Sequence, residues 1–216
     1  MAMILFYAPG TSSLAPHILL REAGLPFTPE KVDLASKHWS GGNFNTVNPK
    51  SYVPALQTDD GDVLTECAVI LQFIADLKPE RGLLPATGTR ARYHALEWLN
   101  FIATEIHGNF ITPERHNGVA ANFLAKTTAG QEATRVWVAP RLAYVDQKLG
   151  ENPFLMGTSF TAPDAYLFVM LTWAQRLALD LAPWHHLFAY YARVADLPSV
   201  HDTLALEGPP HSLRPQ

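Results

Sequence analysis

Residues 3–34, MILFYAPGTSSLAPHILLREAGLPFTPEKVDL, contain the pattern on which the fold depends. MILFY is a short apolar run ended by Pro9-Gly10, as expected of a buried strand. From Ser13 apolar residues recur at helical spacing as far as Gly24, which suits a C-terminal cap. FTPEKVDL then has the character of a second strand. A strand–helix–strand unit of this kind predicts two parallel strands joined by a crossover helix.

The pattern changes twice before residue 90. Residues 35–51 are polar and rich in Gly and Asn, which predicts a loop with little regular structure. YVPALQ and DVLTE flank TDDG, a hairpin signal, and a helix follows from CAVILQF as far as Pro79. The expected order is therefore β-α-β-loop-β-β-α. The Pro-, Gly- and Thr-containing stretch PERGLLPATGT then predicts a linker.

Only helical patterns follow this linker. The predicted helices cover residues 90–111, 130–149, 163–180, 184–195 and 199–206. Thr161 and Asp164 have the spacing of a capping box at the start of the third helix. We therefore expect an α/β domain over residues 1–81, a linker over 82–89 and an all-α domain over 90–216.

Composition excludes several classes of function. Hydrophobic residues make up 48% of the 216 residues and charged residues 17%, as in ordinary globular proteins. The net charge of -4 argues against a nucleic-acid binder. A single cysteine, Cys67, permits neither an internal disulfide nor a cysteine-based zinc cluster. The sequence shows no basic leader, no membrane-spanning apolar run and no metal-binding histidine spacing, so we expect a cytoplasmic protein without a metal.

Ser12 and Ser13 lie where the first strand turns into the first helix. Serine is a common N-cap, so either hydroxyl could serve only the helix. The same junction also presents free N–H groups and the positive end of the helix dipole, which stabilise an anion. The sequence alone leaves both interpretations open.

Two further segments could face a ligand. Pro54 stands at the start of a predicted strand, where a cis Val53-Pro54 bond would turn the Val53 backbone toward a peptide-like ligand. The alternative is an ordinary edge proline. Glu66 and Cys67 begin the next helix, where Glu66 suits an ammonium group and the Cys67 N–H a carboxylate. Helix starts also favour a lowered thiol pKa, so Cys67 could have one, or it could equally be a small inert residue.

Together these segments resemble a known family. YAPGTSSLAPHILLREAGLPF, VDLASK, YVPALQTDDG and LTECAVILQFIAD are similar to segments of the bacterial beta-class glutathione S-transferases. The similarity continues through RYHALEWLNFIATEIH and FTAPDAYLFVMLTWA. The resemblance implies a thioredoxin-like N-terminal domain that binds glutathione, an all-helical C-terminal domain for a hydrophobic electrophile, and a homodimer. Glutathione is the co-substrate, and no permanent cofactor is implied.

The resemblance also assigns site residues. Those matching the family's glutathione contacts are Lys37, Val53, Pro54, Glu66, Cys67, Asn100, Thr104 and Glu105. Thr104 and Glu105 match residues that reach glutathione across the dimer interface. His107 matches a histidine near the sulfur, and Phe110, Tyr166 and Trp173 are expected to line the electrophile site.

One departure from the family bears directly on the chemistry. The beta class usually carries a cysteine where this chain has Ser12, and Ser or Gly where it has Cys67. A hydroxyl cannot form a mixed disulfide with glutathione, so we expect conjugation, with Ser12, Ser13 and His107 as catalytic candidates. The alternatives are a specialised glutathione-dependent reductase, dehalogenase or isomerase, or a non-catalytic binding protein.

Overall fold

The computed structural model describes residues 2–111 and 124–209. Its first part is a four-stranded mixed sheet in the order β2-β1-β5-β6. β1 (Met3–Tyr7) and β2 (Phe27–Lys31) are parallel and are joined by α1 (Leu14–Ala23). β5 (Ala55–Gln57) and β6 (Val63–Thr65) form the predicted antiparallel hairpin, and α2 (Cys67–Leu77) follows. The crossover and the element order expected from the sequence are therefore confirmed.

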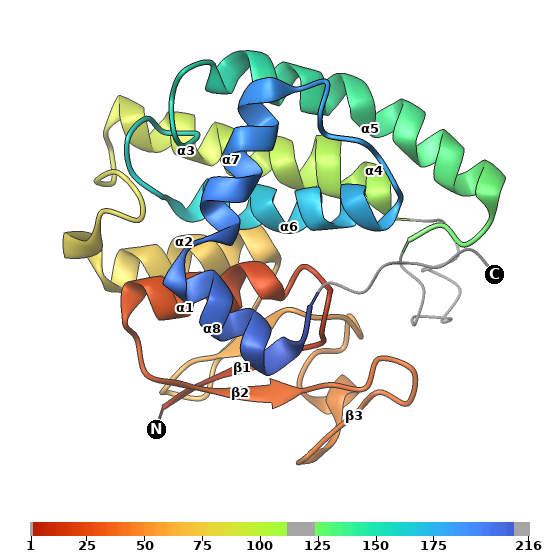
Figure 1. Ribbon diagram of the computed structural model, residues 1–216. Helices are drawn as coiled ribbons and strands as arrows, with labels where there is room; N and C mark the ends of the chain where they lie inside the picture. Colours follow the sequence, from red (N-terminus) through yellow and green to blue (C-terminus); the bar gives the residue numbers. More distant parts are fainter. Residues whose placement is uncertain (1, 112–123, 210–216) are drawn as a thin grey trace.

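The two faces of the sheet are covered differently. α1 and α2 lie on one face, toward the helical part of the molecule (Figure 1). On the other face, Phe44 is fully buried and packs with Trp39 around Phe6. The loop predicted over residues 35–51 therefore contains short elements, β3 (His38–Trp39), β4 (Gly42–Asn43) and η1 (Phe44–Thr46). The two aromatic side chains order it because they bury apolar surface against the sheet.

The second part of the chain is helical. After η2 (Pro79–Arg81), its elements are α3 (Arg90–Phe101), η3 (Ile102–His107), α4 (Gly108–Phe110), α5 (Thr128–Leu149), α6 (Ala162–Arg176), α7 (His185–Ala195) and α8 (Pro198–Glu207). The helix predicted over residues 90–111 is thus interrupted by η3, a π-helical segment. The helix predicted over residues 163–180 ends earlier, at Arg176, because Ala178 adopts a φ of 55°.

α6 lies at the centre of the helical part and is almost entirely buried. Its start carries the predicted capping box, because Asp164 accepts hydrogen bonds from the Thr161 N–H at 2.8 Å and the Thr161 hydroxyl at 2.6 Å. α6 packs against α1 and α2 of the sheet-containing part and against α3 and α7 of its own part. It is therefore the element through which the two parts are joined.

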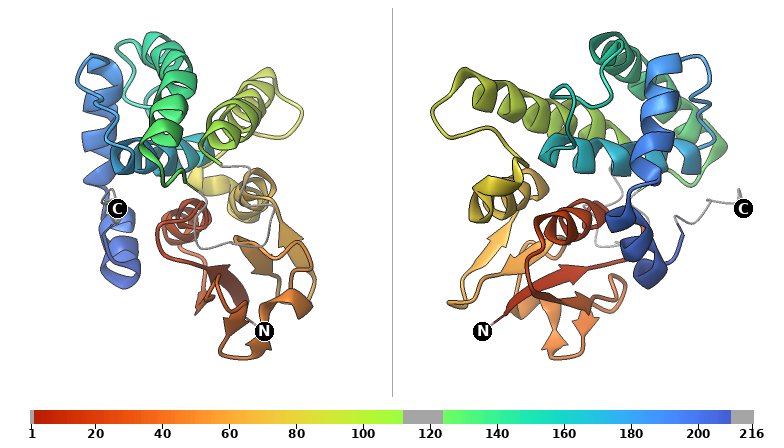
Figure 2. Two further views of the ribbon diagram at one scale, coloured as in Figure 1. Left: turned by 90° about the vertical axis from the view of Figure 1, so that its right-hand side faces the viewer. Right: turned by 60° about the vertical axis from the view of Figure 1, so that its left-hand side comes forward.

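α8 returns to the sheet-containing part and lies beside α1 (Figures 1 and 2). Nδ1 of His17 in α1 lies 2.7 Å from the Glu207 carboxylate of α8, with both side chains buried, and the Ser199 hydroxyl donates to Glu22 at 2.7 Å. We propose a division of the chain into a first domain over residues 1–81, a linker over 82–89 and a second domain over 90–216. α8 of the second domain packs against α1 of the first. Among the described helices, none is long and apolar enough to cross a membrane.

Candidate functional site

The turn between β1 and α1 separates the roles of the two serines. Ser13 is fully buried, and its hydroxyl oxygen accepts from the Ala8 N–H at 3.1 Å and lies 2.7 Å from the Thr11 hydroxyl. The Ser13 side chain therefore holds the turn together and makes no cap bond to the helix. The hydroxyl of Ser12 makes no hydrogen bond within residues 2–111 and 124–209, although the residue is only 5% exposed. Of the two, Ser12 is the one left for a ligand.

Gly10 fixes this turn to the helical domain. Its carbonyl accepts a hydrogen bond from Trp173 Nε1 at 3.0 Å and another from Arg176 at 2.7 Å. The Glu207 carboxylate of α8 lies near its N–H, which counters the rise that burial causes in the Glu207 pKa. With a φ of 71° and a would-be Cβ only 3.2 Å from the Arg176 guanidinium, this position suits glycine. Side chains of α6 and α8 therefore set the position of the backbone that carries Ser12.

The Val53-Pro54 peptide bond, just before β5, is cis. Val53 is buried and packs with the sheet residues Phe6 and Ala55. Lys37 lies near the same segment, since its ammonium group donates to the Ser51 carbonyl at 2.9 Å. The cis bond anticipated for this proline is therefore confirmed, and Lys37 is brought to the same segment.

Glu66 is the residue just before α2, and its φ of 70° turns the backbone sharply into the helix. Its side chain is 52% exposed and accepts from the Lys50 ammonium at 2.7 Å and from the Tyr52 hydroxyl at 2.8 Å. The carboxylate thus already binds one ammonium group, which is the chemistry expected of it. No sequence pattern pointed to Lys50 and Tyr52, which come from the loop before Pro54.

Of the two interpretations left open for Cys67, the structure favours the small inert residue and contradicts a lowered thiol pKa. The thiol is buried, and burial raises its pKa well above the usual value, with a smaller rise from the nearby Glu66 carboxylate. At this position, the loss of hydration on burial raises the thiol pKa by more than the helix start lowers it. The Cys67 sulfur donates to the carbonyl of Ser12 at 3.6 Å. Cys67 therefore contacts the Ser12 backbone as a protonated thiol.

The helical domain brings four of the predicted side chains together, and one of them, Trp173, binds Gly10 of the β1–α1 turn. His107, the last residue of η3, has its Nδ1 2.5 Å from the Tyr166 hydroxyl and its ring edge-on to Trp173 at 4.9 Å. Phe110 meets Trp173 edge-on at 5.9 Å. Phe110, Tyr166 and Trp173 are each at most 2% exposed. They pack as core side chains and leave little surface for a substrate, which argues against the predicted role in lining the electrophile site. Their contacts favour a role in holding His107 in place.

Asn100, Thr104 and Glu105 lie elsewhere on the same helix. The Thr104 hydroxyl donates to the Asn100 carbonyl at 3.0 Å, and both residues are exposed. Glu105 pairs with Arg141 of α5 at 3.1 Å. For the part of the chain that the structure describes, no hydrogen bond or ion pair with a named partner joins these three to the β1–α1 turn. Within one chain they are not part of the cluster around Ser12.

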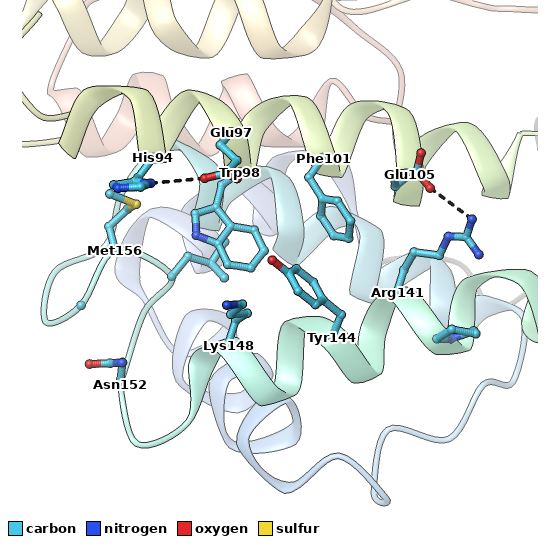
Figure 3. Close-up of a pocket in the computed structure, with 13 residues that line it drawn as sticks. His94, Glu97, Trp98, Phe101, Glu105, Arg141, Tyr144, Lys148, Asn152 and Met156 are labelled. Carbon is cyan, nitrogen blue, oxygen red and sulfur yellow. Dashed lines mark hydrogen bonds and ion pairs between the residues drawn. The ribbon is translucent and has the colours of Figure 1, made fainter. Parts of the chain in front are cut away.

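Glu105 and Arg141 instead close one end of a pocket between α3 and α5 (Figure 3). The pocket has a volume of about 800 Å³, and Trp98, Phe101 and Tyr144 point toward one another inside it. Glu105 is its only predicted site residue. Within the described ranges, no three His, Cys, Asp or Glu residues are grouped closely enough to hold a metal ion.

Comparison with known proteins adds an independent line of evidence. Residues 12–77 match the glutathione S-transferase N-terminal domain, and residues 125–198 match the glutathione S-transferase C-terminal domain. The chain is 41% identical to the glutathione S-transferase GstA of Escherichia coli O157:H7, over 95% of this chain and 99% of that protein.

Two solved structures are similar over the whole fold. A sphingomonad glutathione S-transferase complexed with glutathione is 40% identical, with a TM-score of 0.85 over 95% of this chain and 98% of that one. The beta-class glutathione S-transferase of Sphingomonas chungbukensis is 39% identical, with a TM-score of 0.84 over the same shares. With its mixed sheet, its helical second domain and this degree of identity, the chain belongs to the glutathione S-transferase family and is similar to its bacterial beta class.

Proposed function

We propose that this glutathione S-transferase conjugates glutathione to hydrophobic electrophiles and that the Ser12 hydroxyl stabilises the glutathione thiolate. The observation that carries the role of Ser12 is its hydroxyl, which has no partner among the described residues and lies at the start of α1. A thiolate placed there gains a hydroxyl donor and the positive end of a helix dipole. Ser13 supports the turn through Ala8 and Thr11.

The tripeptide is assigned to the segments that run from the β1–α1 turn, past the cis proline, to the start of α2. The cysteinyl backbone pairs with Val53 before the cis proline Pro54. The γ-glutamyl end meets the Glu66 carboxylate and the N–H of Cys67. Lys37 lies on the side of Ser51, where its ammonium group suits the glycyl carboxylate. These assignments follow the family resemblance and agree with the positions of the side chains.

The required electrostatic effect is modest. A free thiol has a pKa of about 8.5, and lowering it by about 2 needs about 2.7 kcal/mol of preference for the thiolate. One charge-assisted hydrogen bond and the dipole at a helix start together supply a free energy of about that size. The thiolate then attacks the electrophile, so that a carbon–sulfur bond forms while a leaving group departs or an activated double bond accepts the electron pair.

Two further features belong to the proposal. The chain forms a homodimer in which Thr104 and Glu105 reach the glutathione of the other subunit, with Asn100 as a further glutathione contact. It works in the cytoplasm. The support for the dimer is the family resemblance, together with exposed apolar side chains on α2 and α3, such as Val69 and Tyr93 at 46% and 64% exposure. Sedimentation should then give twice the chain mass of 23.9 kDa.

The test of the chemistry is steady-state turnover with a panel of electrophiles, including an activated aryl chloride and an activated alkene. The wild type should turn over several members, and Ser12→Ala should lose about 10- to 100-fold in kcat with little change in KM for glutathione. Turnover of a single isomerisable or reducible compound would favour a specialised enzyme instead. Saturable glutathione binding without any turnover would leave only a binding protein.

A further inference from the structure

The Glu66 carboxylate is paired with an ammonium group of its own chain. Nζ of Lys50 lies 2.7 Å from Glu66 Oε1, and the same ammonium group donates to the Thr65 hydroxyl at 2.9 Å. The Tyr52 hydroxyl also donates to Glu66 Oε1, at 2.8 Å. The loop before the cis proline thus contributes two donors to the carboxylate at the start of α2.

A buried asparagine fixes the loop that carries these donors. Asn48 is 1% exposed, and its side-chain amide donates to the Tyr52 carbonyl at 2.7 Å. Its side-chain oxygen accepts from the Lys50 N–H at 3.1 Å, and its backbone carbonyl accepts from the Ser51 N–H at 2.9 Å. Because these bonds hold the backbone of the loop, the Lys50 side chain starts from a defined position near Glu66.

The pair of Lys50 and Glu66 is open to water, so another ammonium group can compete for the carboxylate. The two side chains are 48% and 52% exposed. Exposed ion pairs are weak because water solvates both charges and salt screens their attraction. The hydrogen bond to Glu66 raises the pKa of the Lys50 ammonium group, which keeps it charged at neutral pH. The carboxylate is therefore occupied in the free protein, but only loosely.

We propose that Lys50 is a specificity-determining residue, which occupies in the free protein the place at Glu66 that the α-ammonium group of glutathione takes on binding. This inference rests on the function proposed above, which assigns the γ-glutamyl end to Glu66 and the N–H of Cys67. Binding exchanges one ammonium group for another at the same carboxylate, and no covalent bond forms or breaks. The displaced Lys50 ammonium group can then pair with the α-carboxylate of the ligand.

This exchange affects which ligands the site distinguishes. A ligand with an α-ammonium group replaces the charge of Lys50 at Glu66, whereas a ligand without one leaves Lys50 in place. In the wild type Lys50 therefore reduces the penalty for a ligand that lacks the ammonium group. Without Lys50, the Glu66 carboxylate attracts an ammonium group more strongly and repels a ligand that carries only the α-carboxylate. Specificity is a difference of two affinities, and Lys50 lowers this difference.

The first test compares two ligands by calorimetry, glutathione and its des-amino analogue, in which hydrogen replaces the α-amino group. The ratio of the Kd of the analogue to the Kd of glutathione should rise about fivefold in Lys50→Met, the size expected for one exposed charge pair. Lys50→Arg keeps the charge and should keep the ratio near the wild-type value. Lys78→Met is the matched control, because Lys78 is also a partly exposed lysine and lies 3.6 Å from a glutamate, Glu80. Its ratio should not change.

The outcomes of this test separate the inference from the proposed function. A lysine that only held the loop in place would weaken both ligands by the same factor, so a ratio that is unchanged or smaller in Lys50→Met overturns the inference alone. Wild-type protein that does not bind glutathione at all contradicts the proposed function, and the inference with it.

The second test observes the pair itself by NMR. The ¹³Cε signal of Lys50 in lysine-labelled protein, assigned from Lys50→Arg, reports the pKa of its ammonium group. In the free protein, Glu66→Gln should lower this pKa toward the ordinary lysine value, and Glu80→Gln should leave it unchanged. Saturating glutathione should shift the Lys50 signal at neutral pH, and the des-amino analogue should shift it less. A Lys50 signal that responds neither to Glu66→Gln nor to glutathione overturns the proposed exchange.

Discussion

Asp164 allows a stability prediction with a defined sign. Its carboxylate is fully buried at the start of α6 and accepts from the Leu155 N–H at 2.9 Å and from both donors of Thr161. Burial raises the pKa of this carboxyl from 3.8 to about 6, against the opposing effect of these hydrogen bonds. The perturbation is Asp164→Asn, which keeps the size of the side chain but removes its titration.

The magnitude follows from linkage. The folded pKa lies above the unfolded one, so the folded protein takes up this proton first as the pH falls. The extra stability is fully present below about pH 4 and is lost as the pH rises through about 6. The gap between the two pKa values corresponds to about 3 kcal/mol. The wild type should therefore gain about 2.4 kcal/mol over Asp164→Asn between pH 7 and pH 4, because the unfolded carboxyl is itself partly protonated at pH 4.

The assay is urea unfolding of both proteins at constant ionic strength from pH 7 to pH 4, analysed by linear extrapolation. Taking the difference between the two proteins cancels the titration of all other groups. Asp202→Asn, on the exposed side of α8, is the control and should show a difference that does not change with pH. A wild-type advantage for Asp164 that is constant or shrinks toward pH 4 would refute the reasoning.

Three further outcomes are expected. Glu207→Ala should lower the free energy of unfolding by about 3–5 kcal/mol, because it leaves a buried histidine without its partner, and Asp202→Ala on the same helix should be nearly silent in the same urea assay. In steady-state kinetics, Glu66→Gln should raise KM for glutathione about tenfold with kcat little changed. Glu80 is another exposed acidic residue, and Glu80→Gln should leave both constants unchanged. Cys67 should resist alkylation by iodoacetamide at pH 8 in the native protein and react quickly in urea, because burial raises its pKa; rapid native labelling, followed by mass spectrometry, would contradict this.

Local patterns account for much of the fold. The crossover from β1 through α1 to β2, the hairpin of β5 and β6, and the capping box of Thr161 and Asp164 all depend on residues close together in sequence. Propensity, turn chemistry and cap spacing therefore identify them without tertiary information.

The remaining features depend on contacts between distant residues. Ser13 looks like an N-cap in sequence, but its hydroxyl binds the backbone of Ala8, the residue just after β1. Cys67 begins a helix, yet the residues that bury it decide its pKa. The pair of His17 and Glu207 joins residues 190 positions apart, and the π-helical turn that places His107 leaves no apolar pattern of its own. None of these can be obtained from local periodicity.

The same distinction applies to the site. Family resemblance names the residues around glutathione, but it does not say which of two neighbouring serines offers its hydroxyl. The contacts of Ser13 with Ala8 and Thr11 support our proposal that this serine is Ser12. Resemblance also implied a substrate-facing role for Phe110, Tyr166 and Trp173, whereas all three side chains are buried, and Tyr166 and Trp173 contact His107 and Gly10.

The central claim is that Ser12 lowers the pKa of bound glutathione. The most direct measurement is a pH titration of the ultraviolet absorbance of the thiolate in the complex, for wild type and Ser12→Ala. The account predicts a wild-type pKa near 6.5, about 2 below the free thiol value, and a rise of about 1 in Ser12→Ala. A wild-type pKa that equals the free value, or one that is low and unchanged in Ser12→Ala, would contradict it.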